Sequence, residues 1–489
     1  MLSKAFKSQS KTVLQQFKRQ FGSNPGILSR IFNTVDTNTS AYSVAKYDPT
    51  VPLKGLKPIE SGELAPEYNI TTLSNGFTVL TESQVFPGAV HMGFLIDVGT
   101  RDETGETSGS LLALKNTFLK TLKHTNETIN YGMIQMSGGD MTMDYDQERM
   151  FFKGHCLEYD TIDMFQMLVD IALEPRSVLA ANVARSKNRK THDLDKHLHK
   201  YDPFSENHEL MLRTAFGYNT LGMPRHGLEH NIDNIDARML QQFVMDNVTP
   251  RKCLIVASGV QNHKEYVDLV KERLGDLLPV PEHMYKRTQS EYIGGEYRTW
   301  TETPQTNIAL AFNSTQWAHE DTAAHMVMQS LIGTSESGRN RAYEITKKHQ
   351  FVDHVSTINN HFSDNGLFGI TIQGAGSHSQ DLLHVALEEL AGLRNRVSDE
   401  ELARAKTKLR MQILTNLETQ DNRLEEIAKN FLTYGDLTFH QYAEQIDKVT
   451  AEDISRAASR TLGTKPTMIV TGGAINLVPT ITDVQRQLQ

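Results

Sequence analysis

The chain reads Ile232-Asp233-Asn234-Ile235-Asp236-Ala237 at one place and Ile446-Asp447-Lys448-Val449-Thr450-Ala451 at another, 214 positions later. The two copies align without a gap, and the register holds onward, where residues 251–256 meet residues 465–470. In both copies a run rich in β-branched residues follows a turn, as in a buried strand. Each copy therefore predicts a short capped helix, a turn and a buried strand.

An upstream strand pattern repeats at almost the same spacing. Residues 91–96 correspond to residues 307–312, an offset of 216. Two matches at nearly one spacing indicate an internal duplication. We therefore expect two homologous halves of about 215 residues each, covering 66–278 and 296–489, with the proline-containing segment 279–295 as their linker.

Local patterns indicate the fold class. Asn75-Gly76 lies between two short strand patterns within residues 71–80, which is typical of a β-hairpin. Residues 398–401 form a capping box that opens a long amphipathic helix. Hairpins and long amphipathic helices within each half predict the α+β class, in which each half is a mainly antiparallel sheet packed with helices.

Composition and charge exclude several classes of protein. The chain has 489 residues and only two cysteines, Cys156 and Cys253, which excludes a disulfide framework and a cysteine-based zinc cluster. No stretch approaches the ~18 uninterrupted apolar residues of a membrane-spanning helix. The net charge is −9, and because residues 1–35 carry +6, the remainder sums to −15. Such an acidic body argues against nucleic acid as a partner and is compatible with a basic peptide or protein.

Residues 1–35 are basic, amphipathic and free of acidic residues. This pattern is typical of a mitochondrial targeting segment, and the alternative is a basic surface helix on a cytosolic protein. Residues 36–65 then form a polar connector to the first half.

Several strings of the body resemble the pitrilysin/insulinase metallopeptidase family. They are Thr72-Leu73-Ser74-Asn75-Gly76, Gly99-Thr100-Arg101-Asp102-Glu103, Asn219-Thr220-Leu221-Gly222 and the tail from Ile446 to Pro479. Their order and spacing over residues 65–489 resemble most the mitochondrial processing peptidase subunits and the related core proteins of respiratory complex III. The resemblance implies two homologous α+β halves.

The family's chemistry resides in a helix with the motif H-x-x-E-H, whose histidines bind Zn²⁺ while the glutamate activates water. The resemblance places Leu112, Lys115 and Asn116 at these positions, and Asp193 near the third ligand. Leucine and asparagine do not replace imidazole ligands, and lysine brings positive charge instead of a base. We therefore expect a catalytically inactive chain with no metal and no cofactor.

Two other histidine-containing stretches invite the same question. Residues 226–230, His226-Gly227-Leu228-Glu229-His230, match the motif letter for letter, but Pro224 and the internal glycine indicate a loop in which His226 and His230 do not share a helix face. Residues 192–199 contain three histidines among acids and lysine, as in a solvated helix end. Metal binding is the less favoured interpretation of both stretches.

In the α subunit of the processing peptidase, a glycine-rich loop guides basic presequences. Residues 331–341 of this chain resemble that loop, and the resemblance implies that the guiding residues would be Gly333, Thr334, Ser335 and Gly338. This stretch has only two glycines and adds two arginines, which reduces mobility and repels a basic peptide. A plain surface turn is the alternative.

The resemblance implies a non-catalytic, core-2-like structural subunit of complex III, bound peripherally on the matrix side of the mitochondrial inner membrane. Its partners would be a β-type or core-1-like subunit and other complex III subunits. The alternative is the presequence-binding α subunit of the processing peptidase, with zinc hydrolysis supplied by a β partner; both roles can coexist. A third interpretation, an autonomous zinc peptidase, requires His226 and His230 to be ligands.

Overall fold

The computed structural model of the chain describes residues 67–83, 88–119, 127–173, 203–231, 234–277, 287–336, 338–395, 397–435 and 439–488. The predicted targeting segment 1–35 and connector 36–65 lie outside these residues, as do Ile232 and Asp233 of the repeated string.

The repeated string forms the same local structure twice. Asp236 caps helix α9 (Ala237–Asn247) by accepting a hydrogen bond from the Met239 N–H, and Thr450 caps helix α17 (Ala451–Leu462) in the same way. Each helix leads into a buried strand, β6 (Cys253–Val260) after α9 and β11 (Pro466–Gly472) after α17. The predicted capped helix and buried strand are therefore confirmed in both copies.

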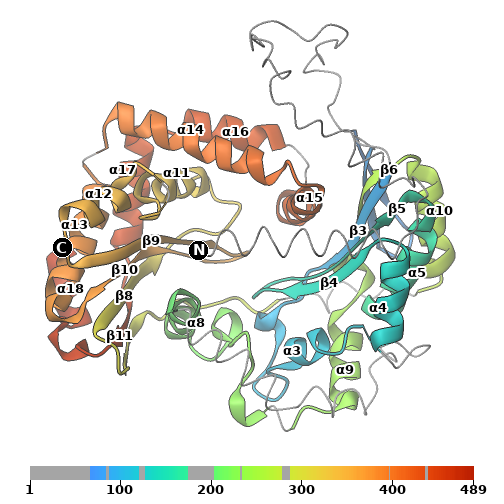
Figure 1. Cartoon of the computed structure of the whole chain (residues 1–489), viewed down its shortest axis with the longest axis horizontal. Helices are drawn as coiled ribbons and strands as arrows, with labels where there is room; N and C mark the ends of the chain where they lie inside the picture. The colour runs from blue at the N-terminus through green and yellow to red at the C-terminus, as the bar shows by residue number, and fades with distance from the viewer. Residues whose placement is uncertain are drawn as a thin grey trace, which may run out of the picture. The chain divides into compact units, whose positions relative to one another are not determined.

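The first half is a six-stranded sheet in the order β1-β2-β6-β3-β5-β4, antiparallel except for the β2–β6 pair (Figure 1). Its other strands are β1 (Tyr68–Thr72), β2 (Thr78–Ser83), β3 (Ala89–Ile96), β4 (Asp140–Tyr145) and β5 (Met150–Leu157). Strands β1 and β2 form the predicted hairpin, whose turn places Gly76 at a φ of 102°. The helices of this half that the structure describes are α3 (Ser110–Lys115), α4 (Glu127–Met136), α5 (Thr161–Ala172), α8 (Pro203–Phe216), α9 and α10 (His263–Leu274).

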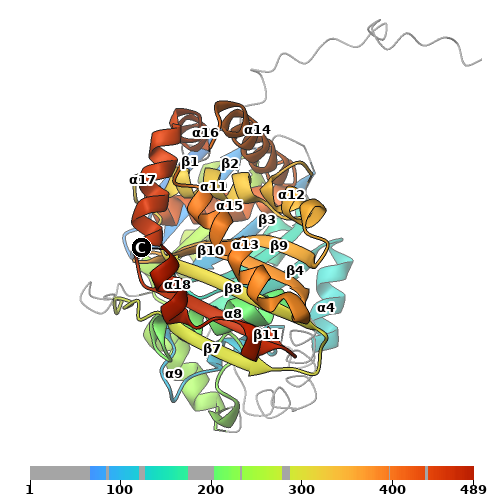
Figure 2. The same cartoon turned by 90° about the vertical axis from the view of Figure 1, so that its left-hand side faces the viewer.

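The second half repeats this plan with a five-stranded sheet in the order β7-β11-β8-β10-β9, again with one parallel pair, β7–β11 (Figure 2). Its other strands are β7 (Gly295–Trp300), β8 (Gln305–Asn313), β9 (Val352–His361) and β10 (Gly366–Ala375). Its described helices are α11 (Thr322–Ile332), α12 (Arg341–Lys348), α13 (Ser379–Gly392), α14 (Asp399–Asn416), α15 (Gln420–Tyr434), α16 (Phe439–Lys448), α17 and α18 (Ile481–Leu488). The α+β class is confirmed.

Among the described elements, each sheet carries helices of its own half on one face and one helix of the other half on the opposite face. Helix α8 of the first half packs on β7, β8 and β11, while α15 of the second half packs on β3 and β6 (Figure 1). The two exchanged helices occupy corresponding positions in the repeat, because α8 begins at Pro203 and α15 at Gln420. The halves are thus joined by a reciprocal exchange of equivalent helices.

Apolar side chains fill both exchange contacts. On the first sheet the contact consists of residues buried to 5% exposure or less, namely Leu80, Leu95, Phe151, Leu254, Val256, Leu424, Ile427 and Ala428. On the second sheet Met211, Ala215 and Phe216 of α8 pack against Ala311 and Ile469. Strand alternation sends the neighbours of these strand residues to the other face, where they join the core of their own half.

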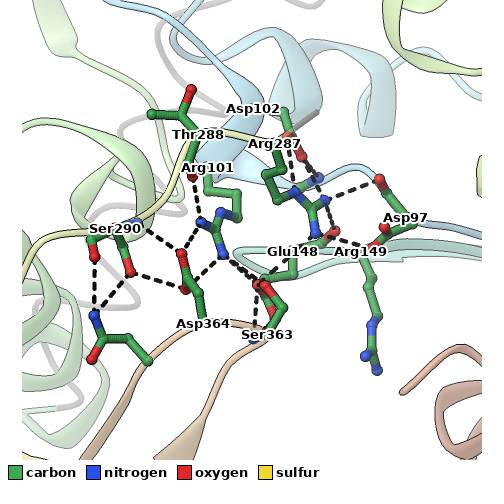
Figure 3. A network of polar contacts seen from close by, with 12 residues as sticks. Asp97, Arg101, Asp102, Glu148, Arg149, Arg287, Thr288, Ser290, Ser363 and Asp364 are labelled. Atoms are coloured by element: carbon green, nitrogen blue, oxygen red, sulfur yellow. Dashed lines mark hydrogen bonds and ion pairs between the residues drawn. The ribbon is translucent and has the colours of Figure 1, made fainter. Parts of the chain in front are cut away.

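A polar network joins the tips of two corresponding hairpins near the exchanged helices (Figure 3). The Arg101 guanidinium, whose side chain is 1% exposed, bridges Glu148 after β4 and Asp364 after β9. Glu148 and Asp364 are 216 positions apart, the offset of the strand repeat. Glu148 also accepts hydrogen bonds from the Ser363 N–H, at 3.0 Å to Oε2. Burial alone would raise the pKa of Asp364, but Arg101 and Ser290 hold it below its ordinary value.

The predicted capping box at residues 398–401 forms only in part. Ser398 caps α14 by accepting from the Glu401 N–H at 3.3 Å, as the capping box predicts. The Glu401 carboxylate does not return a bond to Ser398, because it accepts both Nε and Nη2 of Arg341, at 2.6 and 3.0 Å. A bidentate pair of a carboxylate with a guanidinium is stronger than the single bond from a backbone N–H that it replaces.

The helix exchange predicts a large difference between two methionine substitutions. Met211→Ala should lower the free energy of unfolding by about 2–4 kcal/mol, because Met211 is 1% exposed against the opposite sheet. Met411→Ala on α14 is the matched control, since Met411 is 69% exposed and should change it by less than about 0.5 kcal/mol. Urea denaturation followed by fluorescence measures both values, and equal effects would contradict the packing role of α8.

Candidate functional site

The three positions that the resemblance assigns to the zinc motif lie on or at the end of helix α3. Leu112 is 8% exposed and belongs to the apolar core of the first half. Lys115 extends toward strand β4, where its Nζ lies 2.8 Å from Asp144 Oδ1. Asn116 ends the helix, with its backbone N–H bonded to the Leu112 carbonyl. The three positions are thus a core residue, a member of an ion pair and the residue that ends the helix.

A buried carboxylate holds the start of this helix. Glu103 accepts hydrogen bonds from the N–H groups of Gly109 and Leu111, at 2.9 and 2.8 Å. Gly109 is the N-cap residue and has a φ of 95°, a conformation that favours glycine. Burial raises the pKa of Glu103 to about 8, while the backbone donors act in the opposite direction. A buried carboxylate and a glycine with positive φ therefore fix the start of α3, the helix to which the resemblance assigns the motif.

The stretch from His226 to His230 is not an α-helix, as expected. Gly227 has a φ of 74°, and a 3₁₀ turn covers Glu229–Asn231. His226 Nδ1 lies 3.4 Å from Glu209 Oε2 on α8. Within the described residues, no group of three or more His, Cys, Asp or Glu side chains is placed to hold a metal ion.

The position of this stretch is not evident from the sequence. The Leu228 N–H donates to Ser108 Oγ at 3.1 Å, and a Cβ on Gly227 would lie 2.5 Å from the Cα of Gly109. Two glycines thus allow the loop to pack directly on the start of α3, about 120 positions away in the chain. The long separation in sequence hides this contact, and only the two glycines could have indicated it.

Two other stretches that were considered for metal binding, and not favoured, are outside the described residues. Asp193, proposed near the third zinc ligand, and the histidine-containing residues 192–199 both fall in the segment between α5 and α8 that the structure does not describe.

The predicted guiding loop follows helix α11, and its first residues are bonded to the edge strand β9. Gly333 ends α11 with a φ of 68°, and its carbonyl accepts a hydrogen bond from Thr357 Oγ1 at 2.9 Å. The Ser335 N–H donates to the Val355 carbonyl at 2.9 Å. The Thr334 carbonyl accepts from Asn340 Nδ2 at 2.9 Å, which closes the turn.

The far end of this loop is more open. Gly338 has a φ of 88° and an added Cβ there would meet no atom within 4 Å. Ser337 lies outside the described residues. Arg341, the last residue of the stretch 331–341 and its second arginine, forms an ion pair with Glu401 at the start of α14.

Comparisons with known proteins agree with this architecture. Residues 234–409 match the family description "Peptidase M16 inactive domain". The chain is 28% identical over 441 residues to mitochondrial-processing peptidase subunit alpha-2 of Dictyostelium discoideum, covering 86% of this chain and 94% of the relative. It is 25% identical over 435 residues to a probable mitochondrial-processing peptidase subunit beta of Arabidopsis thaliana, covering 86% and 81%.

A solved structure shares the fold. A chain in the structure of complex III2 from Candida albicans superposes with a TM-score of 0.74 at 18% identity, covering 86% of this chain and 99% of that chain. The resemblance that the sequence indicated is confirmed: residues 234–409 match an inactive M16 peptidase domain, most of the chain is similar to subunits of the mitochondrial processing peptidase, and a chain of complex III2 has the same fold.

Proposed function

We propose that this chain is a non-catalytic, core-2-like structural subunit of respiratory complex III that pairs with a β-type or core-1-like subunit. The observation that carries the proposal is the composition of helix α3, where Leu112 is in the core and Lys115 is paired with Asp144. A zinc peptidase needs three protein ligands and an open coordination position at this place. A core methyl group and an ammonium ion offer neither.

The match of residues 234–409 to an inactive peptidase domain supports the same proposal. The proposal is also supported by the presence of both alpha and beta processing peptidase subunits among the relatives, each of which matches along most of the chain. Related chains of two kinds within one peptidase suggest a heterodimeric setting, in which the partner would supply any zinc chemistry. A chain from complex III2 with the same fold supports the choice of complex.

Mitochondrial localisation is part of the proposal. It is supported by the names of the relatives and by the basic, acid-free residues 1–35. Among the residues that the structure describes, no helix is both long and apolar enough to cross a membrane. We therefore assign a peripheral position on the matrix side of the inner membrane.

The second candidate function is presequence binding, as the α subunit of a processing peptidase. Gly338 and the open space around it favour this role, because a guiding loop must move. The bonds from the β9 edge to Gly333 and Ser335 argue against it, since they fix the first part of the loop. Arg339 is exposed and would repel a basic peptide. We therefore rank the structural role first.

Native electrophoresis of mitochondrial membranes in mild detergent tests the choice of complex. We expect the chain to migrate with a large cytochrome-containing assembly. Migration solely as a soluble dimer, at about twice the 55.1 kDa of the chain, would contradict the core-subunit role and favour a matrix processing peptidase.

Deletion of Gly333–Gly338 tests presequence guiding. We expect assembly with the partner and presequence cleavage by the pair to be unchanged, because the loop has no guiding role in the proposal. Because the deletion also removes bonds to β9, Arg339→Glu is a second variant with little structural effect, and it should leave cleavage unchanged. Lys264→Glu is its control, a charge reversal at an exposed residue of the first half. Altered cleavage in both loop variants, with assembly intact and the control normal, would establish the guiding role instead.

Metal analysis of the purified full chain tests the absence of a zinc site. We expect far less than one zinc ion per chain, because α3 lacks ligands and the described residues include no group of three or more His, Cys, Asp or Glu side chains that could hold a metal ion. The His226→Ala variant should give the same value. A stoichiometric ion that is lost in this variant would show that the loop is a metal site.

A further inference from the structure

Residues of helices α4 and α5, which Figure 1 labels on the first half, line a groove. Its volume is about 460 Å³, and methionines form much of its lining: Met133, Met136, Met164 and Met167. Met164 is buried, but Met133 is 44% exposed and Met136 is 89% exposed. Methionine side chains are flexible and polarizable, and they adapt to apolar groups of different shape. The floor of the groove is therefore suited to receive apolar side chains.

The charged residues that line the groove all have the same sign. They are Asp160, Asp163 and Asp170, and none of the lysines or arginines that the structure describes lines it. Asp170 is already paired with Arg273, at 3.2 Å. Within the described residues, Asp160 and Asp163 form no salt bridge, although both lie at the start of α5. Two carboxylates are thus available beside the methionines.

Exposed apolar residues extend this surface beyond the groove. Tyr159, immediately before Asp160, is 78% exposed, and Ile162, immediately before Asp163, is 55% exposed. Exposed apolar side chains therefore adjoin both carboxylates in the chain. A surface that combines methionines, exposed apolar side chains and carboxylates is complementary to a segment that carries apolar residues flanked by cations.

The corresponding place in the second half has a different character. Helices α12 and α13 occupy the positions in the second half that α4 and α5 occupy in the first. The cavity of about 650 Å³ that they help to line is bordered by six lysines or arginines and four glutamates. There Arg341 and Glu401 pair with each other. The acidic groove is therefore specific to the first half and is not a general product of the duplicated fold.

We propose that the α4–α5 groove is a docking site for a cationic amphipathic helix of a partner protein. Apolar residues of that helix would contact the methionines, and its lysines or arginines would pair with Asp160 and Asp163. A helix lying in a groove between two helices is a common mode of recognition. This role goes beyond the proposed structural function and uses residues in neither α3 nor the Gly333–Gly338 loop.

Fluorescence anisotropy with the full chain and a labelled amphipathic peptide of leucine, alanine and lysine tests the proposal. The double variant Asp160→Asn/Asp163→Asn should weaken binding about five-fold, because two exposed ion pairs are lost. Asparagine is also favoured at the N-cap position, which Asp160 occupies, so α5 should be preserved. Glu272→Gln/Asp276→Asn removes two exposed charges elsewhere in the same half and should bind as the wild type does.

The apolar contribution is tested separately. Met133→Ser/Met136→Ser should weaken binding, whereas Met133→Leu/Met136→Leu should retain it, because leucine preserves the apolar surface. Deletion of Gly333–Gly338 should leave binding unchanged, which separates this site from presequence guiding. Wild-type affinity in both the aspartate and the serine variants would overturn the proposal. Equal binding of a peptide with glutamate in place of lysine would also overturn it.

Discussion

The exchange of helices α8 and α15 is the constraint on which the rest of the body depends. A sheet with two apolar faces has to be covered on both sides, and each half supplies helices for only one face of its own sheet. The remaining face is covered by the partner half. Because burial of this apolar surface stabilises both halves at once, neither sheet is completed by its own sequence alone.

This arrangement also explains why the hairpin tips meet. With the two sheets held in a fixed relation by the exchanged helices, the turn after β4 and the turn after β9 come close enough for Arg101 to bridge Glu148 and Asp364. A buried arginine between two carboxylates specifies geometry more than it adds stability, since desolvation offsets much of the attraction. The network therefore acts as a positional lock on a contact whose free energy is mainly apolar.

Much of the fold could be predicted from the sequence because the duplication leaves local marks. The helix caps at Asp236 and Thr450 and the turn at Gly76 are set by nearest neighbours, and all three are as expected. The exchange could not be predicted, because an amphipathic pattern shows that a helix has an apolar face but not which sheet covers it.

The candidate site, too, could be predicted from the sequence only in its local features. At the positions that the resemblance assigns to the zinc motif, the chemistry of Leu112 and Lys115 indicated that they are unsuited to zinc, and the structure gives both side chains other contacts. The approach of Gly227 to Gly109 depends on three-dimensional contact between distant segments, and so does the diversion of Glu401 to Arg341. Neither is encoded in a short window of sequence.

The exchange has a consequence for how the chain is made. As the chain emerges from its N-terminus, whether during synthesis or during import, the strands of the first sheet are complete once β6 has appeared, but α15, which covers one of its faces, begins only at residue 420 of 489. Until then Leu80, Leu95 and Val256 remain exposed on an incomplete sheet. Exposed sheet faces of this kind promote aggregation of folding intermediates. Chaperone binding would have to protect that face until α15 arrives.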